Sequence, residues 1–348
     1  MGRTIIFAMA ACFSLMAGIA AAEHGPGGKP QPDPDLARYA PSSPVAGAVR
    51  VVGSETMQPL LNRLAADFRR RHVDARVSVE GGGSASAVKE FLEKRRDSKS
   101  IDLGRVEAPN EPLIVASSRA LSESEIKHFS AKHGYKPTAV PIAVDAVAIY
   151  VNRDNPLREI TLAQLDAMFS STRYRGADEI TRWGAFGLGG EWEQAEIHLY
   201  GRDEKSGTRA FVKEHVLQHG EFSPLIHAEV GAASVILAVS RDRYGIGYSG
   251  IGLQASTVRA LALSPAAGRP AVEPTAETVA DGSYPLRRLL YLSVDRPATG
   301  SGDAVVNAFV AFATSREGQE AVIRAGFYPV TSKQIGEGMP AVAANEAR

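Results

Sequence analysis

Three segments of this chain share one pattern, in which a short apolar strand leads into a turn rich in Gly, Ser and Thr and then directly into a helix. The turns are Gly53-Ser54-Glu55-Thr56-Met57, Gly81-Gly82-Gly83-Ser84-Ala85-Ser86 and Arg202-Asp203-Glu204-Lys205-Ser206-Gly207-Thr208-Arg209. Apolar residues four apart follow the first turn, which indicates an amphipathic helix. Strands and helices keep alternating along the chain, which predicts an α/β fold with mainly parallel sheets flanked by helices.

The same turns predict an anion site. A helix start presents backbone N–H groups that lack intrahelical partners, and the helix dipole places partial positive charge there. Two arginines, Arg202 and Arg209, flank the third turn, and a guanidinium matches the geometry of a tetrahedral oxyanion. We therefore expect helix starts to converge on a phosphate-like group. The alternative is that Ser and Thr merely cap these helices.

The order of these motifs resembles the phosphate-binding protein of the bacterial high-affinity phosphate ABC transporter. Two further motifs contribute to the resemblance, Ala116-Ser117-Ser118-Arg119 and Tyr244-Gly245-Ile246-Gly247-Tyr248, and together the motifs extend over residues 48–332. The resemblance implies a type II periplasmic-binding-protein fold whose two lobes close over one dehydrated phosphate in the interlobe cleft. It also implies no catalysis and no cofactor, with inorganic phosphate and the membrane permease and ATPase of a transporter as partners.

The ligand residues that the resemblance implies follow motif by motif. The family's first-loop threonine and the residue after it correspond to Thr56 and Met57, the second-loop serine to Ser84, and the arginine to Arg202. The full implied set is Ser54, Thr56, Met57, Ser84, Ser118, Arg202, Ser206, Gly207 and Thr208, with Glu55, Arg119, Asp145 and Arg209 as additional candidates.

Ser118 departs from the family pattern, because well-known members carry an aspartate there that accepts the phosphate proton and excludes sulfate. Phosphate keeps at least one proton at neutral pH and sulfate keeps none, so a phosphate-selective site needs a buried proton acceptor. We expect a carboxylate from elsewhere, with Glu55 as the first candidate and Asp145 as the second. The alternatives are that Glu55 stabilises its own helix start and that Asp145 forms a structural ion pair.

The charge balance and the motifs argue against several other classes of function. The 39 basic and 39 acidic residues balance, which argues against bulk electrostatic binding to nucleic acid or to an anionic membrane. His215 and His219 lie four apart with no third ligand at a fitting spacing, so we expect no metal site. We expect a monomer. Two other functions remain possible. One is a surface or matrix protein with an adhesive or structural role. The other is a phosphatase-like enzyme, which would need an activated nucleophile or a metal.

The N-terminal residues 1–22 predict a signal peptide, with Arg3, the apolar stretch Thr4–Ala20 and the small residues Ala20-Ala21-Ala22. The single cysteine, Cys12, lies in a poor lipobox, so we expect export to the periplasm without a lipid anchor. Residues 23–47 are rich in Gly and Pro and predict a flexible lead.

The expected lobe boundaries follow from two strands that we expect to connect the lobes. The β-branched stretch Thr138–Asn152 predicts the strand that crosses from lobe one to lobe two, and Tyr244–Tyr248 predicts the strand that returns. Lobe one is therefore expected at 48–142 and 252–334, lobe two at 143–251, and a C-terminal tail at 335–348.

Overall fold

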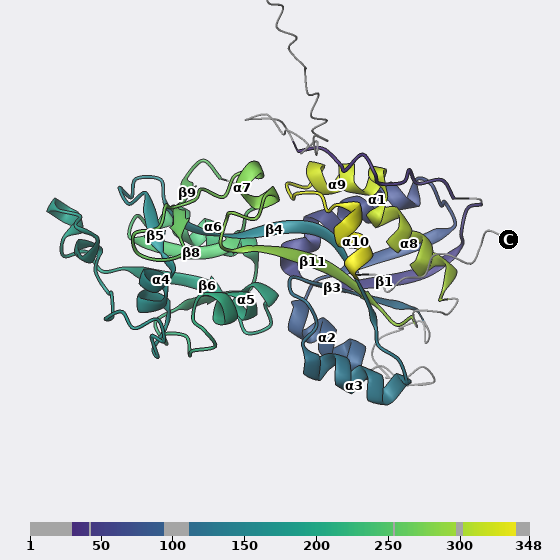
Figure 1. Cartoon of the computed structure of the whole chain (residues 1–348), viewed down its shortest axis with the longest axis horizontal. Coiled ribbons are helices and arrows are strands. Elements are labelled where there is room, and N and C mark those ends of the chain that lie inside the picture. The colour runs from purple at the N-terminus through teal and green to yellow at the C-terminus, as the bar shows by residue number, and fades with distance from the viewer. Residues whose placement is uncertain (1–29, 42, 94–110, 253–254, 297–301, 339–348) are drawn as a thin grey trace, which may run out of the picture.

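The computed structural model describes residues 30–41, 43–93, 111–252, 255–296 and 302–338 (Figure 1). The predicted signal peptide, residues 1–22, lies outside these ranges. Two bodies of strands and helices lie next to each other and are joined by the long strands β4 (Thr138–Asn152) and β11 (Arg287–Val294). We call the body around the first strand lobe one and the other body lobe two. The fold is α/β and two-lobed, as the sequence predicts.

Lobe one places helices on both faces of its strands. Phe68, Phe309 and Phe312 pack helices of one face against the strands, whereas Phe91 and Phe129 pack the helices of the other face. Its elements are β1 (Gly47–Gly53), η1 (Glu55–Met57), α1 (Gln58–Arg69), β2 (Ala75–Glu80), α2 (Ser84–Glu93), β3 (Leu113–Ser117), α3 (Glu123–His133), α8 (Ala304–Thr314) and α9 (Arg316–Arg324). The last helix, α10 (Ser332–Gly338), packs against β4.

Lobe two surrounds a separate core that contains Trp183 and Tyr248, both fully buried. Its strands are β5 (Glu159–Thr161), β6 (His198–Arg202), β7 (His227–Glu229), β8 (Gly245–Gly250), β9 (Val258–Ala260) and β10 (Ala262–Ser264). Its helices are α4 (Leu162–Phe169), η2 (Trp183–Phe186), η3 (Gly190–Trp192), α5 (Gly207–His215), α6 (Ala232–Arg241) and α7 (Ala276–Ala280).

One curled, mixed sheet runs through both lobes in the order β2-β1-β3-β11-β4-β8-β6-β7, and β9 pairs with β4. Pairing inside the lobes is parallel, for β1 with β2 and β3 and for β6 with β7 and β8. The long strands β4 and β11 are antiparallel to their neighbours. Because parallel strands end at one edge of a sheet, the turns after β1, β3 and β6 all lie near the junction of the lobes.

Strand β4 forms because its apolar and β-branched residues can be buried on both faces. Its register against β11 shifts between Leu290 and Tyr291, whose partners are Ala143 and Pro141. Proline cannot donate to the ladder and is tolerated at such bulges. Ala143 packs in the lobe-one core and Val144 in the lobe-two core. The irregularity therefore lies next to the point where β4 passes from one lobe to the other.

The returning strand differs from the expectation at Tyr244–Tyr248. Strand β8 stays inside lobe two, and β11 makes the return by pairing with β4 and then with β3. Residues such as Leu263, Val279 and Leu286 pack with Tyr248 in the lobe-two core, although we expected 252–334 to belong to lobe one. The physical reason is that the apolar side chains between β8 and β11 are buried before the chain crosses back.

Both ends of the described chain are more ordered than the sequence suggests. The expected flexible lead includes Leu36, which is buried, and Tyr39, which packs edge-on against Phe312. Asp33 Oδ2 accepts a hydrogen bond from the Ser332 backbone N–H over 2.8 Å. Residues 335–338, expected in a C-terminal tail, belong to α10. Among the described residues, no helix is long and apolar enough to span a bilayer.

Candidate anion-binding site

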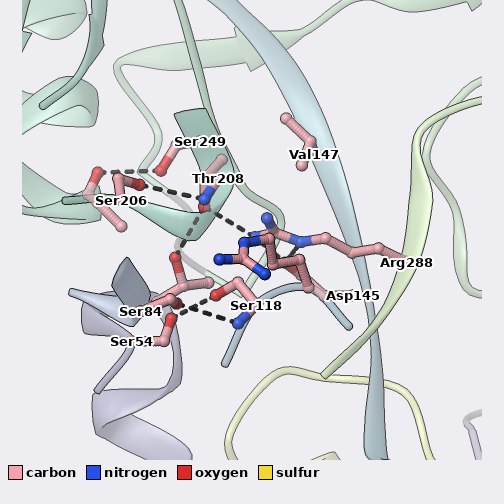
Figure 2. Close-up of polar contacts among 12 residues, drawn as sticks. Ser54, Ser84, Ser118, Asp145, Val147, Ser206, Thr208, Ser249 and Arg288 are labelled. Atoms are coloured by element: carbon pink, nitrogen blue, oxygen red, sulfur yellow. Dashed lines mark hydrogen bonds and ion pairs between the residues drawn. The ribbon is translucent and has the colours of Figure 1, made fainter. Parts of the chain in front are cut away.

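Three serines of lobe one meet at the junction of the lobes. Ser54 follows β1, Ser84 begins α2 and Ser118 follows β3, and all three are buried. The Ser118 N–H donates to Ser84 Oγ over 3.2 Å, and the hydroxyls of Ser54 and Ser118 share a hydrogen bond. Figure 2 shows the three serines grouped together opposite the residues of α5. The first two turns that the sequence singles out thus converge. Ser118, at the position where well-known family members carry an aspartate, lies with them.

Lobe two contributes the start of α5. Ser206 is its N-cap, because its Oγ accepts from the backbone N–H groups of Thr208 at 3.1 Å and Arg209 at 3.4 Å. Its capping role is therefore real. The Thr208 hydroxyl is buried and lies 3.2 Å from the hydroxyl of Thr56 in lobe one. Two threonines from opposite lobes therefore face each other at the centre of the site.

Arg202 ends β6 and points into this centre from lobe two. It is only 1% exposed, its Nη1 lies 3.5 Å from Thr56 Oγ1, and its Nη2 donates to the Val230 carbonyl over 2.9 Å. Its Nε is buried and has no hydrogen-bond partner among the described residues. Burial lowers the pKa of Arg202, yet a guanidinium keeps its charge in proteins. Burying a cation whose N–H donor is unpaired is costly, so this arrangement favours binding of an anion next to Arg202.

Arg288, which the sequence analysis did not single out, completes the centre. Its Nε and Nη2 donate to Asp145 Oδ2 over 2.9 and 2.7 Å, and Nη2 also donates to Thr208 Oγ1 over 2.9 Å. Arg288 and Asp145 are direct partners in the β11–β4 ladder, and both are buried. The only sequence signal was a charge in an apolar strand, and the adjacent Arg287 gives the same signal.

The charges of the centre do not balance. Arg202 and Arg288 are both buried, and among the described residues Asp145 is the one carboxylate that forms an ion pair with either of them. Burial of unpaired charge is costly, so two buried arginines against one aspartate favour binding of an anion. Asp145, an additional candidate from the sequence, thus lies in the centre and also forms the ion pair that we weighed as its alternative role.

Three other candidates lie away from this centre. Glu55 Oε1 accepts the Gly82 N–H over 2.5 Å and so supports the second turn. Arg119 pairs with Glu125 over 2.7 Å at the start of α3. Arg209 lies over the Phe222 ring, 3.8 Å from its centroid, and donates to the Arg202 carbonyl.

The remaining two candidates, Met57 and Gly207, make contacts within and between the lobes. The Met57 side chain is buried in the lobe-one core, and its N–H donates to the Ser54 carbonyl over 3.0 Å. Gly207 lies against lobe one so closely that a β-carbon built on it would be 2.6 Å from Ser84 Oγ. Close approach of the lobes also appears where the Ala85 N–H donates to the Lys205 carbonyl over 3.1 Å. Both contacts cross between the lobes, so the site is formed by both of them together.

Comparisons with known proteins agree with this architecture. The family model described as "PBP superfamily domain" matches residues 39–317. The phosphate-binding protein PstS of Pseudomonas aeruginosa PAO1 is 36% identical over 302 residues, which cover 86% of this chain and 88% of that protein.

Solved structures share the fold. A Clostridium perfringens protein solved with bound phosphate superposes with a TM-score of 0.65 at 22% identity, covering 82% of this chain and 100% of that one. An ABC-type phosphate transport receptor from Vibrio cholerae has a TM-score of 0.59 at 21% identity, covering 81% and 100%. On the extent of the family match and of the Pseudomonas relative, this chain belongs to the PBP superfamily, within the PstS family of binding proteins.

Proposed function

We propose that this protein is an exported solute-binding protein that captures inorganic phosphate between its two lobes and delivers it to an ABC transporter. The observation that carries the proposal is the buried centre itself, in which two arginines have, among the described residues, only one carboxylate as ionic partner and lie beside the facing hydroxyls of Thr56 and Thr208. Fixed N–H and O–H donors around uncompensated positive charge favour a small, compact anion. The Pseudomonas relative is named as a phosphate-binding protein, which supports phosphate among such anions.

The proposed ligand contacts come from both lobes. Arg202 and Thr208 would act from lobe two, and Thr56, Ser84 and Ser118 from lobe one, with the α5 N-terminus supplying backbone N–H groups. Such a set replaces the hydration shell of phosphate by preorganised donors. We propose that the site binds without catalysis.

The remaining parts of the proposal concern compartment, assembly and lobes. We propose a periplasmic monomer that meets the membrane permease and ATPase of its transporter. For the lobes we propose residues 48–143 with 290–327 around the first core and residues 144–289 around the second, because Ala143 and Leu290 pack in the first core whereas Val144 and Leu289 pack in the second.

Isothermal titration calorimetry of the chain lacking residues 1–22 tests the function directly. Phosphate should bind with a one-to-one stoichiometry, and a sugar or an amino acid should give no heat. No heat with phosphate but clear heat with a sugar or an amino acid would refute the proposal. Release of phosphate from a phosphomonoester by the same preparation would favour the phosphatase-like alternative instead.

A further inference from the structure

The Asp145–Arg288 pair is unusual for a structural ion pair, because each partner keeps a buried atom without a hydrogen-bond partner. An arginine and a carboxylate normally pair through two parallel bonds that use both carboxylate oxygens. Here Arg288 Nε and Nη2 both donate to Asp145 Oδ2. Within the part of the chain that the structure describes, Asp145 Oδ1 and Arg288 Nη1 are buried and have no hydrogen-bond partner. The pair therefore leaves one strong acceptor and one strong donor available side by side.

These two atoms lie beside the proposed phosphate site. Arg288 Nη2 donates to Thr208 Oγ1 over 2.9 Å. A β-carbon built on Gly250 would lie 2.8 Å from Thr56 Cγ2 and 3.4 Å from Asp145 Oδ1, so the carboxylate and Thr56 are near neighbours. Figure 2 shows Asp145 and Arg288 next to Thr208 at the junction of the lobes. The free acceptor is thus positioned for contact with an anion held by the two threonines.

We propose that Asp145 Oδ1 accepts a hydrogen bond from the O–H of a protonated tetrahedral oxyanion while Arg288 Nη1 donates to one of its oxygens, so that this pair selects hydrogen phosphate or arsenate over sulfate. The inference rests on the proposed function. No covalent bond changes, and the ligand keeps its proton in the shared hydrogen bond. Sulfate has no proton at neutral pH, so its oxygen would face the carboxylate with lone pair against lone pair.

The electrostatics of Asp145 fit an acceptor. Burial raises the pKa of the Asp145 carboxyl above its ordinary value, while the Arg288 guanidinium and two backbone N–H groups favour the ionised form. A carboxylate with a raised pKa is more basic and accepts a shared proton more strongly. Among the described residues, Oδ1 accepts no hydrogen bond of good geometry, which costs part of the desolvation of that oxygen, and the ligand O–H reduces this cost.

Glu55, the other carboxylate that we considered, is less suited to this role. Its Oε1 already accepts the Gly82 N–H over 2.5 Å, and the residue is only partly buried. Its contact stabilises the second turn rather than leaving a free buried acceptor. The structure therefore ranks Asp145 before Glu55, in the reverse of the order that the sequence suggested.

Competition calorimetry of the chain lacking residues 1–22 tests the inference, with phosphate, arsenate and sulfate as titrants at neutral pH. The parent should bind phosphate and arsenate and exclude sulfate. Asp145→Asn should lower the ratio of phosphate to sulfate affinity at least tenfold, because the amide can donate to sulfate. The matched control is Asp166→Asn, since Asp166 is also fully buried in lobe two with one unpartnered oxygen. The control should keep the parent's ratio.

The double variant Asp145→Asn/Arg288→Gln removes both charges together, so it avoids a lone buried cation if Asp145→Asn alone fails to fold. It should also lose selectivity. A folded Asp145→Asn or double variant that discriminates as well as the parent would overturn the inference while leaving phosphate binding intact. Loss of discrimination in Glu55→Gln but not in Asp145→Asn would overturn it in favour of Glu55. A parent that binds no phosphate would instead overturn the proposed function.

Discussion

Arg202 is the residue on which the proposed anion site depends most. Replacing it with Ala should weaken phosphate binding more than tenfold, because losing one partner of a buried charge pair costs about 2–5 kcal/mol. Arg202→Lys should recover only part of the affinity, since an ammonium cannot form the bidentate fork. Calorimetry measures both effects. Arg243→Ala is the control, because Arg243 pairs with Glu191 on the surface of the same lobe. A Lys variant that binds as well as the parent would contradict a bidentate role.

At the same scale, the sequence identifies residues that sit in local motifs and misses those that act through tertiary pairing. Thr56, Ser84 and Thr208 could be found because strand, turn and helix signals surround them. Arg288 could not, because its role depends on β11 lying opposite Asp145 across 143 positions of chain. Whether Arg287 or Arg288 faces inward depends on strand register, which only the partner strand fixes.

His72 joins the N-terminal segment to lobe one and should make its attachment sensitive to pH. The ring is buried, with Nδ1 accepting from the Val45 N–H over 3.0 Å and Nε2 lying 2.6 Å from the Tyr39 hydroxyl. Burial, and then the nearby Arg71, lower the pKa of His72 below 6.5. The unfolded state therefore binds more protons just below pH 6.5, and stability falls as pH falls through that window.

This linkage predicts a difference between the parent and His72→Gln. The unfolding free energy of the parent should decrease below pH 6.5 with an extra slope of up to about 1.4 kcal/mol per pH unit. His72→Gln should lack this extra slope, although it should be less stable at neutral pH. Urea titrations at several pH values between 5 and 7.5 measure both quantities. Equal slopes for the two proteins would show that His72 does not titrate with folding.

At the scale of elements, the start of α5 offers a way to separate folding from closure. Gly207→Ala places a β-carbon 2.6 Å from Ser84 Oγ and 3.2 Å from Ser118 Cβ, both in the opposite lobe. Such overpacking should weaken phosphate binding by about 1–3 kcal/mol. Alanine also has a higher helix propensity than glycine, so an open molecule should be no less stable.

The test of Gly207→Ala compares calorimetric affinity with the Tm of the ligand-free protein. Gly189→Ala is the control, because a β-carbon on Gly189 meets no atom within 4 Å. We expect weaker binding with an undiminished Tm for Gly207→Ala and no change for the control. Unchanged affinity in Gly207→Ala would mean that the lobes do not approach each other so closely around the ligand.

Elements with local end signals were predictable. Capping boxes open α3 at Ser122 and α4 at Thr161, and left-handed Gly134 ends α3, and each of these end signals can be read from the local sequence. The returning strand was not predictable, because β11 begins with two arginines and its neighbours β3 and β4 lie far away in sequence. Trp183 and Trp192 lie in a segment of short 3-10 helices and turns, yet both are buried in the lobe-two core. Their burial depends on tertiary packing that no local pattern reports.

At the scale of the whole molecule, the two lobes share one sheet, so closure must deform the strands between them. Among the described strands of the sheet, β4 and β11 are the two that pass from one lobe core to the other, and their ladder is irregular at Leu290 and Tyr291. A bulge interrupts hydrogen bonding locally and bends more easily than a regular ladder. This position lies inside Thr138–Asn152, the strand that the sequence predicts to cross between the lobes, whereas β8, at the predicted return strand, remains inside lobe two.

We therefore predict that phosphate closes the molecule by rotation of rigid lobes about the β4–β11 ladder. The radius of gyration from small-angle scattering should fall on addition of saturating phosphate. The Tm should rise with phosphate concentration, because the ligand binds only the folded state. Sulfate at equal ionic strength is the control, and it should change neither quantity. Scattering that stays constant while the Tm rises would mean that phosphate enters a site already assembled by direct contacts such as that between Thr56 and Thr208. The β4–β11 bulge would then be a packing irregularity that carries no motion.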